Sequence, residues 1–369
     1  MKICYIISDI DKAVYFEQTA LSLREAGIDV SYILINCTHK KLHLFLTEHA
    51  FEVFTLEASS LLKSGKVIRE CKTLLKQINA EVVHCHLAHA NWIGLRAARR
   101  AGIKKRIYTR HSGEPLTLHW KERVIDTIQN RLATKIVAIS KNIDDLLAKQ
   151  GVNTSKRVLI HHGFNLERFA HPDLREIDRI KTQYNPENKA PNIGVISRWL
   201  ELKGIQYIIA GFEKFLQEYP DARLYLFGAS DNADHSTEIN RLLAHFAPEN
   251  IRVVPFEHNV FDLYQLFDIY IHVPINPNCE AFGQTYVEAL AAGIPSIFTL
   301  SGVAREFIIH EENALVVPFK DSDAIYESMV RLMNDPALCA NLTTKGVQNV
   351  NRMFRFDSYI EKLQKLYRS

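Results

Sequence analysis

Two glutamates with seven residues between them, Glu280 and Glu288, are well placed to bind sugar hydroxyls. Glu280 follows the apolar run 268–273, and Glu288 lies in a segment that we expect to be helical from about Gly283 to Gly293. Each carboxylate oxygen accepts two hydrogen bonds, which suits the hydroxyls of a sugar or a ribose. Gly283 would let the backbone approach a ligand, and the free N–H groups of the first helical turn would bind hydroxyls or phosphate. The alternative is a pair of ordinary surface glutamates.

Two cations, Arg198 and Lys203, follow the apolar run 192–197, where a strand would open into a helix. Guanidinium and ammonium groups at such a strand end can converge on a pyrophosphate and stabilise its charge as it leaves. The competing interpretation is a salt-bridged loop, because charged residues are common in loops.

The spacing of His84, His86 and His89 suggests a metal site. A strand would place the first two histidines on one face without fixing the third, and no carboxylate or cysteine pair completes a ligand set. Zinc is therefore the less favoured interpretation of these residues.

The hydrophobic pattern predicts the elements that position these residues. Short apolar runs, most of them continuous, alternate with amphipathic segments such as 16–26, as in parallel sheets buried on both faces. A polar, Pro-containing stretch, 171–191, separates two such series. Repeated βα units predict two doubly wound sheets, whose ligands bind beyond the carboxyl ends of the strands. The expected strands are 2–7, 29–35, 82–86, 106–110, 135–139 and 157–161, and then 192–197, 223–227, 251–255, 268–273, 295–299 and 314–317.

Composition limits the class of protein. The 369 residues are 47% hydrophobic and 24% charged, with dispersed Gly and Pro, which excludes disordered, fibrous and repeat proteins. Six cysteines, none in a C-x-x-C pair, predict a reducing compartment. We expect neither a signal peptide nor a membrane span, and therefore a cytoplasmic protein.

Charge is distributed unevenly, although the net charge is only +3. Residues 1–165 hold 25 Lys and Arg against 15 Asp and Glu, whereas the remainder holds 20 against 27. This basic front half predicts an anionic partner, either a lipid-phosphate surface or a phosphorylated substrate. Residues 96–106 carry several of the cations and would suit a membrane surface, and the alternative is a solvated basic face. No nucleic-acid recognition module accompanies the excess, so nucleic acid is not an expected partner.

The segment 279–295 resembles the E-x7-E motif of the retaining glycosyltransferases of family 4, which have the GT-B fold. The segment 194–204 is similar to the family's G-R-x-x-x-x-K-G segment, and the similarity extends through most of the chain. The resemblance implies an α/β protein of two Rossmann-like doubly wound domains that face each other across a cleft. The implied parts are an acceptor-binding domain at 1–166, an interdomain connection at 167–190, a nucleotide-sugar-binding domain at 191–350, and a C-terminal helix at 351–369 that crosses back to the first domain.

The resemblance also implies roles for individual residues. The first glutamate of the motif would contact the donor sugar and the second the ribose, with the two cations on the pyrophosphate. A histidine after a front-domain strand would meet the donor sugar, and neither a metal nor a cofactor is implied. The implied catalytic residues are Glu280, Arg198, Lys203 and His111, and the implied donor-binding residues are Glu288, Ala281, Phe282, Gly283, Gln284 and Gly228.

Two loops depart from the family pattern. Residues 8–13 stand where many members have a Gly-rich loop, and we interpret Asp9 and Asp11 there as loop or acceptor contacts. At the domain junction His162 and Asn165 depart from the family's N-G-x-D, which leaves their role open.

The favoured function is a retaining, metal-independent glycosyltransferase of the hexosyltransferase class. It would move a sugar from a nucleotide diphosphate sugar, with UDP favoured, to a hydroxyl of a glycan or lipid-linked glycan in cell-surface polysaccharide or lipopolysaccharide assembly. Such an acceptor would suit a peripheral position on the inner face of the membrane. The alternatives are a sugar-nucleotide epimerase on the same fold and a non-catalytic nucleotide-sugar-binding subunit.

Overall fold

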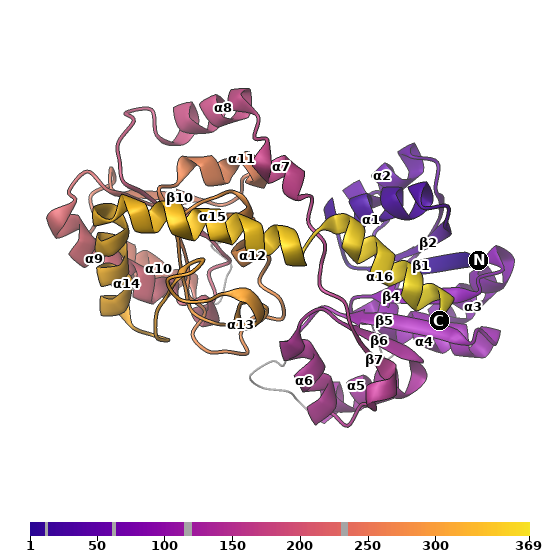
Figure 1. The fold of residues 1–369 in the computed structure, drawn as a ribbon. Helices are drawn as coiled ribbons and strands as arrows, with labels where there is room; N and C mark the ends of the chain where they lie inside the picture. The colour runs from indigo at the N-terminus through magenta and orange to yellow at the C-terminus, as the bar shows by residue number, and fades with distance from the viewer. Residues whose placement is uncertain (12–13, 61–63, 114–119, 230–234) are drawn as a thin grey trace. The chain divides into compact units, whose positions relative to one another are not determined.

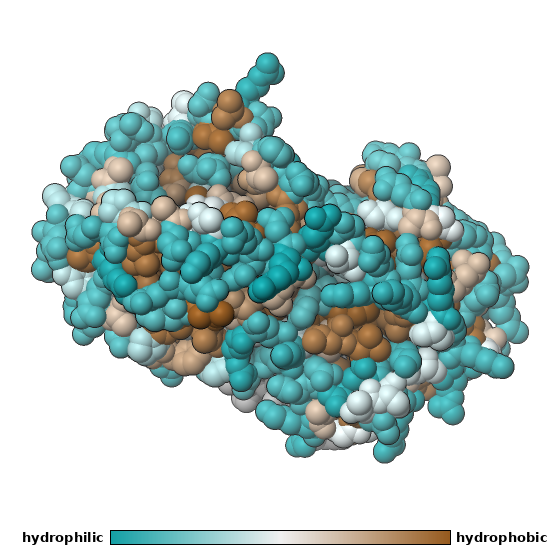
Figure 2. All heavy atoms as spheres, in the orientation of Figure 1, coloured by the Kyte–Doolittle hydropathy of each residue, from teal (hydrophilic) through white to brown (hydrophobic). Residues whose placement is uncertain are grey.

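The chain folds into two compact units (Figure 1). Unit 1 combines Met1–Phe164 with Phe356–Ser369, and unit 2 is Asn165–Arg355. Hydrophilic side chains cover most of the face shown in Figure 2. Within the described ranges no helix combines the length and the apolar character that a membrane crossing requires. The computed structural model describes residues 1–11, 14–60, 64–113, 120–229 and 235–369.

Unit 1 is built on a parallel sheet of seven strands in the order β3-β2-β1-β4-β5-β6-β7. Its central strands are buried along almost their whole length, as their continuous apolar sequences predict. All six expected runs of this half are confirmed as strands. The elements are β1 (Lys2–Ser8), α1 (Val14–Glu25), β2 (Asp29–Ile35), α2 (Lys41–Glu48), β3 (Glu52–Leu56), α3 (Gly65–Ile78), β4 (Val82–His86), α4 (Ala88–Ala101), β5 (Lys105–Arg110), α5 (Trp120–Leu132), β6 (Lys135–Ala138), α6 (Lys141–Lys149), η1 (Thr154–Lys156), β7 (Arg157–Leu159) and α16 (Phe356–Arg368).

Strand β3 is the strand that the hydrophobic pattern missed. It pairs with β2 from Ser31 opposite Glu52 to Ile35 opposite Leu56, at the edge of the sheet. None of its residues is fully buried, because an edge strand has a neighbour on one side only. Glu52 and Thr55 interrupt its apolar residues, so β3 carries no continuous apolar run that the sequence could indicate.

Unit 2 holds a second parallel sheet, of six strands in the order β10-β9-β8-β11-β12-β13. All six expected runs of the second series are confirmed as strands, and a two-sheet α/β fold is therefore confirmed. The elements are α7 (Leu166–Ala170), α8 (Leu174–Tyr184), β8 (Asn192–Ile196), η2 (Glu201–Lys203), α9 (Ile205–Glu218), β9 (Arg223–Phe227), α10 (Ser236–Leu243), β10 (Ile251–Val254), α11 (Val260–Leu263), η3 (Tyr264–Leu266), β11 (Ile269–His272), α12 (Gln284–Ala291), β12 (Ser296–Phe298), α13 (Ala304–Phe307), β13 (Leu315–Val316), α14 (Ser322–Asn334) and α15 (Pro336–Met353).

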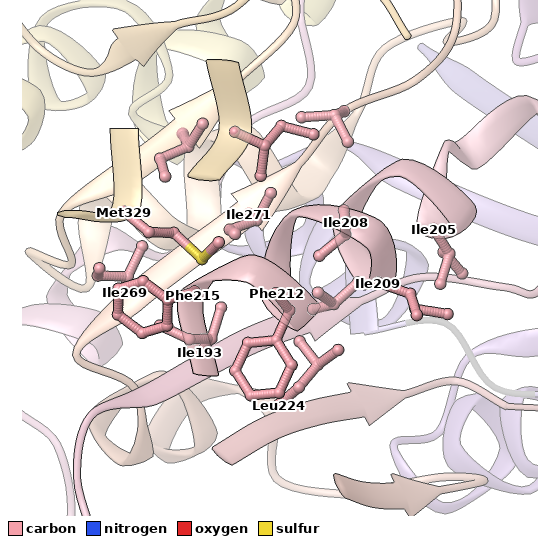
Figure 3. Packing of buried hydrophobic residues seen from close by; sticks show 14 of the residues in the cluster. Ile193, Ile205, Ile208, Ile209, Phe212, Phe215, Leu224, Ile269, Ile271 and Met329 are labelled. Carbon is pink, nitrogen blue, oxygen red and sulfur yellow. The ribbon is translucent and has the colours of Figure 1, made fainter. Parts of the chain in front are cut away.

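The core of unit 2 forms between helix α9 and the sheet (Figure 3). Apolar residues recur along α9 at intervals of three and four, so Ile208, Phe212 and Phe215 share one face. They pack with strand residues such as Ile193 and Ile271. Burial of each such side chain contributes about 1.5–3 kcal/mol, which fixes the sheet whose edge carries the candidate site.

The stretch 167–190, expected as an interdomain connection, is largely helical and belongs to unit 2. Helix α8 buries Ile180 and Tyr184, and its polar residues occupy the exposed face. Arg168 of α7 is held by a bidentate contact with the fully buried carboxylate of Asp262, at 3.1 and 2.6 Å. These two helices need few apolar residues, because each buries only one face against the rest of unit 2.

The C-terminal helix α16 packs in unit 1, against α1 among other elements. It buries Tyr359, Leu363 and Tyr367 in the hydrophobic cluster of that unit. The chain therefore leaves unit 2 after Arg355, and both of its ends belong to unit 1.

Candidate functional site

Loops that follow the strands of unit 2 approach each other very closely at the carboxyl edge of the sheet. Gly204 has φ +74°, and a Cβ atom there would lie 2.1 Å from the carbonyl oxygen of Val273. Gly228 has φ +93°, and a Cβ atom there would lie 2.7 Å from the carbonyl oxygen of Ser197. Only glycine fits either position, so the loops after β8, β9 and β11 form one continuous edge.

Glu280 is held at this edge by two cationic or hydrogen-bonding side chains. Its Oε1 lies 2.5 Å from Nζ of Lys203 and 3.0 Å from Nε2 of His272, the last residue of β11. Its backbone N–H donates to Oγ of Ser301 at 3.0 Å. Lys203 was predicted to lie at the site, whereas His272 was missed.

The protonation of this group follows from its surroundings. Burial by itself would raise the pKa of Glu280, but the hydrogen bond from His272 and the charge of Lys203 lower that pKa to about 2. Burial lowers the pKa of His272, so its imidazole is neutral at pH 7 and donates from Nε2. Glu280 is therefore an ionised carboxylate that one cation and one neutral donor hold in place.

Glu288 has the opposite protonation tendency. It lies half-buried on α12, and its Oε2 accepts a hydrogen bond of 2.9 Å from the hydroxyl of Tyr264. Burial raises its pKa to about 7, because the hydrogen bond from Tyr264 only partly offsets the cost of a buried charge. The two glutamates of the motif thus differ strongly in acidity, and nothing in their spacing indicates that.

The amino end of α12 lies beside Glu280. The helix begins at Gln284, after Gly283 with φ +89°, and ends before Gly293, as expected from the sequence. Gln284 is exposed and Ala281 half-buried. The Phe282 ring is buried and faces the ring of Phe354 at a centroid distance of 5.8 Å. The Phe282 side chain is therefore committed to packing, and its carbonyl oxygen accepts a hydrogen bond of 2.9 Å from the N–H of Val303.

Arg198 follows β8 as predicted, and its side chain is exposed. Within the described part of the chain it makes no ion pair, in contrast to Lys203. The structure therefore brings Lys203 to Glu280 and leaves the guanidinium of Arg198 at the surface of unit 2.

His111 lies in unit 1, directly after β5, within a group of aromatic residues. Its Nε2 lies 3.0 Å from Nδ1 of His86, and its ring stacks on that of His162 at 5.6 Å. Burial lowers the pKa of His111 to about 4 and those of His86 and His162 well below their usual range. These imidazoles are neutral at pH 7, so they can donate or accept hydrogen bonds but carry no charge.

Both ring nitrogens of the neighbouring His84 are hydrogen-bonded to other side chains. Its Nδ1 lies 2.7 Å from the hydroxyl of Tyr367, and its Nε2 lies 2.8 Å from Oγ1 of Thr109. His89 instead pairs with Asp9, at 2.7 Å. Among the described residues no cluster of His, Cys, Asp and Glu has a metal-binding arrangement. Of the loop 8–13, residues 12 and 13 lie outside the described ranges.

Known proteins resemble this chain over most of its length. The family model Glycosyltransferase Family 4 matches residues 13–168, and Glycosyl transferases group 1 matches residues 176–348. N-acetyl-alpha-D-glucosaminyl L-malate synthase of Bacillus anthracis is 21% identical over 326 residues, which are 87% of this chain and 82% of the relative. The capsular polysaccharide biosynthesis glycosyltransferase CapM of Staphylococcus aureus is 22% identical over 357 residues, 94% of this chain and 91% of the relative. The crystal structure of Anabaena HepE in complex with UDP-glucose has a TM-score of 0.85 at 17% identity and covers 100% of both chains.

Proposed function

Because this chain belongs to the glycosyltransferases of the GT-B fold, with a Family 4 front half and a group 1 back half, we propose that it transfers a sugar from a UDP-sugar to a glycan or lipid-linked glycan. In this proposal the anomeric configuration is retained and no metal takes part. Unit 2 binds the nucleotide sugar, and unit 1 binds the acceptor.

The observation that carries the proposal is the fixed carboxylate of Glu280 at the carboxyl edge of the second sheet. Ligands of open α/β sheets bind at this edge, and a carboxylate with a single defined orientation can select sugar hydroxyls by accepting their hydrogen bonds. Lys203, in the loop after β8, and His272, at the end of β11, supply that orientation. Glu288, on the helix that follows, is the acceptor for the ribose hydroxyls.

The proposed chemistry breaks the bond between the anomeric carbon and the phosphate oxygen, with oxocarbenium character. Lys203 and the exposed Arg198 stabilise the negative charge that develops on the leaving pyrophosphate, which is commonly the largest contribution of such sites. The leaving phosphate takes the proton of the acceptor hydroxyl as the new glycosidic bond forms on the same face.

A lipid-linked acceptor would place the enzyme at the inner face of the membrane. The basic excess of the front half supports this part of the proposal, because cationic side chains are attracted to anionic lipid headgroups. Arg99 and Arg100, at the end of α4, are exposed and available for such contacts.

Calorimetric titration with UDP and GDP tests the donor site. We expect UDP to bind, and Glu288→Ala to weaken binding by about tenfold, because the ribose loses its acceptor. Glu327→Ala, an exposed glutamate on α14, is the matched control and should bind like the wild type. If neither UDP nor GDP binds, the proposed donor site is contradicted.

The anomeric configuration of the product, followed by NMR with a UDP-sugar that supports turnover, tests retention. An inverted product would overturn the retaining mechanism. Isomerised sugar nucleotide formed without any acceptor would instead indicate an epimerase.

A further inference from the structure

Unit 1 contains a cavity of about 450 Å³ beyond the carboxyl ends of β4 and β5, between helices α4 and α5. This volume lies within the range of small-molecule sites. The side chains of Leu87 and Ile125 form apolar parts of the cavity wall, and His111 also lines the cavity. Ala88 and Gly113 add small residues, and the other lining residues are polar or charged. These polar groups determine which ligands the cavity can select.

Two buried amide side chains, those of Asn91 and Gln129, line this cavity. Asn91 of α4 is 7% exposed, and its buried Oδ1 has no hydrogen-bond partner within the described part of the chain. Gln129 of α5 is 4% exposed and brings a second amide to the lining. Leaving a buried polar group unsatisfied costs about 1–3 kcal/mol. An amide offers both donors and acceptors, which is the complement of a hydroxyl group.

Arg110 and Asp126, two charged residues of the cavity, neutralise each other. Arg110, 7% exposed, lies with its Nη1 2.8 Å from Oδ1 of Asp126, and its Nε donates to the carbonyl oxygen of Ser112 at 3.0 Å. The guanidinium therefore has no uncompensated charge to offer an anion. Glu122, also on the lining, adds a negative charge that would repel a phosphate.

We propose that this cavity binds the uncharged, hydroxyl-bearing saccharide end of the acceptor, with Asn91 and Gln129 as its hydrogen-bonding residues. The inference rests on the proposed function and adds the class of group that receives the sugar. The apolar faces of Leu87 and Ile125 pack against the C–H surface of the saccharide. The anionic part of a lipid-linked acceptor lies outside the cavity, where the basic surface of unit 1 meets it.

Saturation-transfer NMR on the full chain in the presence of UDP tests the proposal. The probes are neutral methyl glycosides of glucose, galactose and N-acetylglucosamine, together with the corresponding sugar 1-phosphates. We expect a methyl glycoside to bind more tightly than its phosphate counterpart. Asn91→Leu and Gln129→Leu should each weaken that binding by about tenfold, the effect of losing one or two hydrogen bonds to the ligand.

Gln77→Leu, an exposed amide on α3, is the matched control and should leave binding unchanged. The side-chain amide signals of Asn91 and Gln129 in the wild type give a second readout that does not depend on the variants folding, and both signals should shift on binding. Tighter binding of the phosphates, binding that neither substitution affects, or unshifted amide signals would overturn the proposal. If the wild-type protein binds UDP but none of the neutral methyl glycosides, this inference alone is overturned. If the wild-type protein does not bind UDP, the result counts against the glycosyltransferase site itself.

Discussion

At the level of single residues, the two glutamates of the motif show how partners determine protonation. Glu280 is buried next to a cation and a neutral imidazole, which lower its pKa to about 2. Glu288 is half-buried next to a hydroxyl only, and its pKa rises to about 7. The first is therefore a permanent acceptor, and the second titrates in the physiological range.

The ion pair between Lys203 and Glu280 predicts the effect of Lys203→Met. Both side chains are nearly buried, at 12% and 11% exposure, so the substitution leaves a carboxylate without its cation. We expect unfolding in urea at pH 7 to show a loss of about 3 kcal/mol. In the double variant with Glu280→Gln most of this loss should be absent, because no charge is then buried alone. Equal losses in the single and double variants would contradict this account.

The same pair predicts how stability depends on pH. The pKa of Glu280 in the folded chain lies below its ordinary value of 4.5, so its contribution is complete above pH 4.5 and is lost as the pH falls toward 2. Urea unfolding between pH 5 and pH 2 should therefore show a smaller acid-induced decrease for Glu280→Gln than for the wild type. Identical pH profiles would show that the carboxylate is not held as described.

The raised pKa of Glu288 predicts pH-dependent nucleotide binding. Only the ionised carboxylate accepts hydrogen bonds from both ribose hydroxyls, so UDP affinity should rise by about tenfold between pH 6 and pH 8. Calorimetry with Glu288→Gln provides the reference, since the ligand's own phosphate titration is common to both proteins. A wild-type profile parallel to that of the variant would show that Glu288 does not titrate at the site.

At the level of elements, the tight contact of two loops predicts that Gly204 tolerates no side chain. Gly204→Ala would place its Cβ 2.1 Å from a carbonyl oxygen, so the loops after β8 and β11 must separate. We expect a loss of more than about 3 kcal/mol in urea unfolding, together with weaker UDP binding. Gly27→Ala is the matched control, because Gly27 has a similar φ of +72° but nothing within 4 Å, and it should cost only about 1–2 kcal/mol. Similar costs at both positions would contradict the close approach.

At the level of the whole molecule, the return of α16 to unit 1 ties the end of the chain to its beginning. The hydroxyl of Tyr367 lies 2.5 Å from that of Tyr5 and 2.7 Å from Nδ1 of His84. Tyr367→Phe leaves both partners buried with a bond missing, at a cost of about 1–3 kcal/mol. Hydrogen-exchange mass spectrometry should show faster exchange in β1 and β4 and no change in unit 2.

The matched control for this prediction is Tyr326→Phe, which removes an exposed hydroxyl that contacts Glu218 in unit 2. Its effect should stay within about 0.5 kcal/mol. Faster exchange spread evenly over both units in Tyr367→Phe would show that α16 is not a part of unit 1 in solution.

The sequence by itself determined the strands with continuous apolar runs, the helix between Gly283 and Gly293, and the position of Glu280 before that helix. These features depend on local periodicity and on the conformational freedom of glycine, which a linear pattern records. The edge strand β3 was missed because Glu52 and Thr55 interrupt its apolar residues, and helix α8 was missed because charged and polar residues outnumber its apolar ones.

Only the tertiary structure decided the partners of the site residues. Lys203 and Glu280 are 77 residues apart in the chain, and His84 and Tyr367 are 283 residues apart. His272 is the polar residue near the end of the apolar run 268–273, which was a signal, but nothing in its spacing from Glu280 showed that the two side chains would meet. Burial and nearby charge set a pKa, and both arise from the packing of distant segments, so the opposite acidities of the two glutamates became visible only in the folded chain.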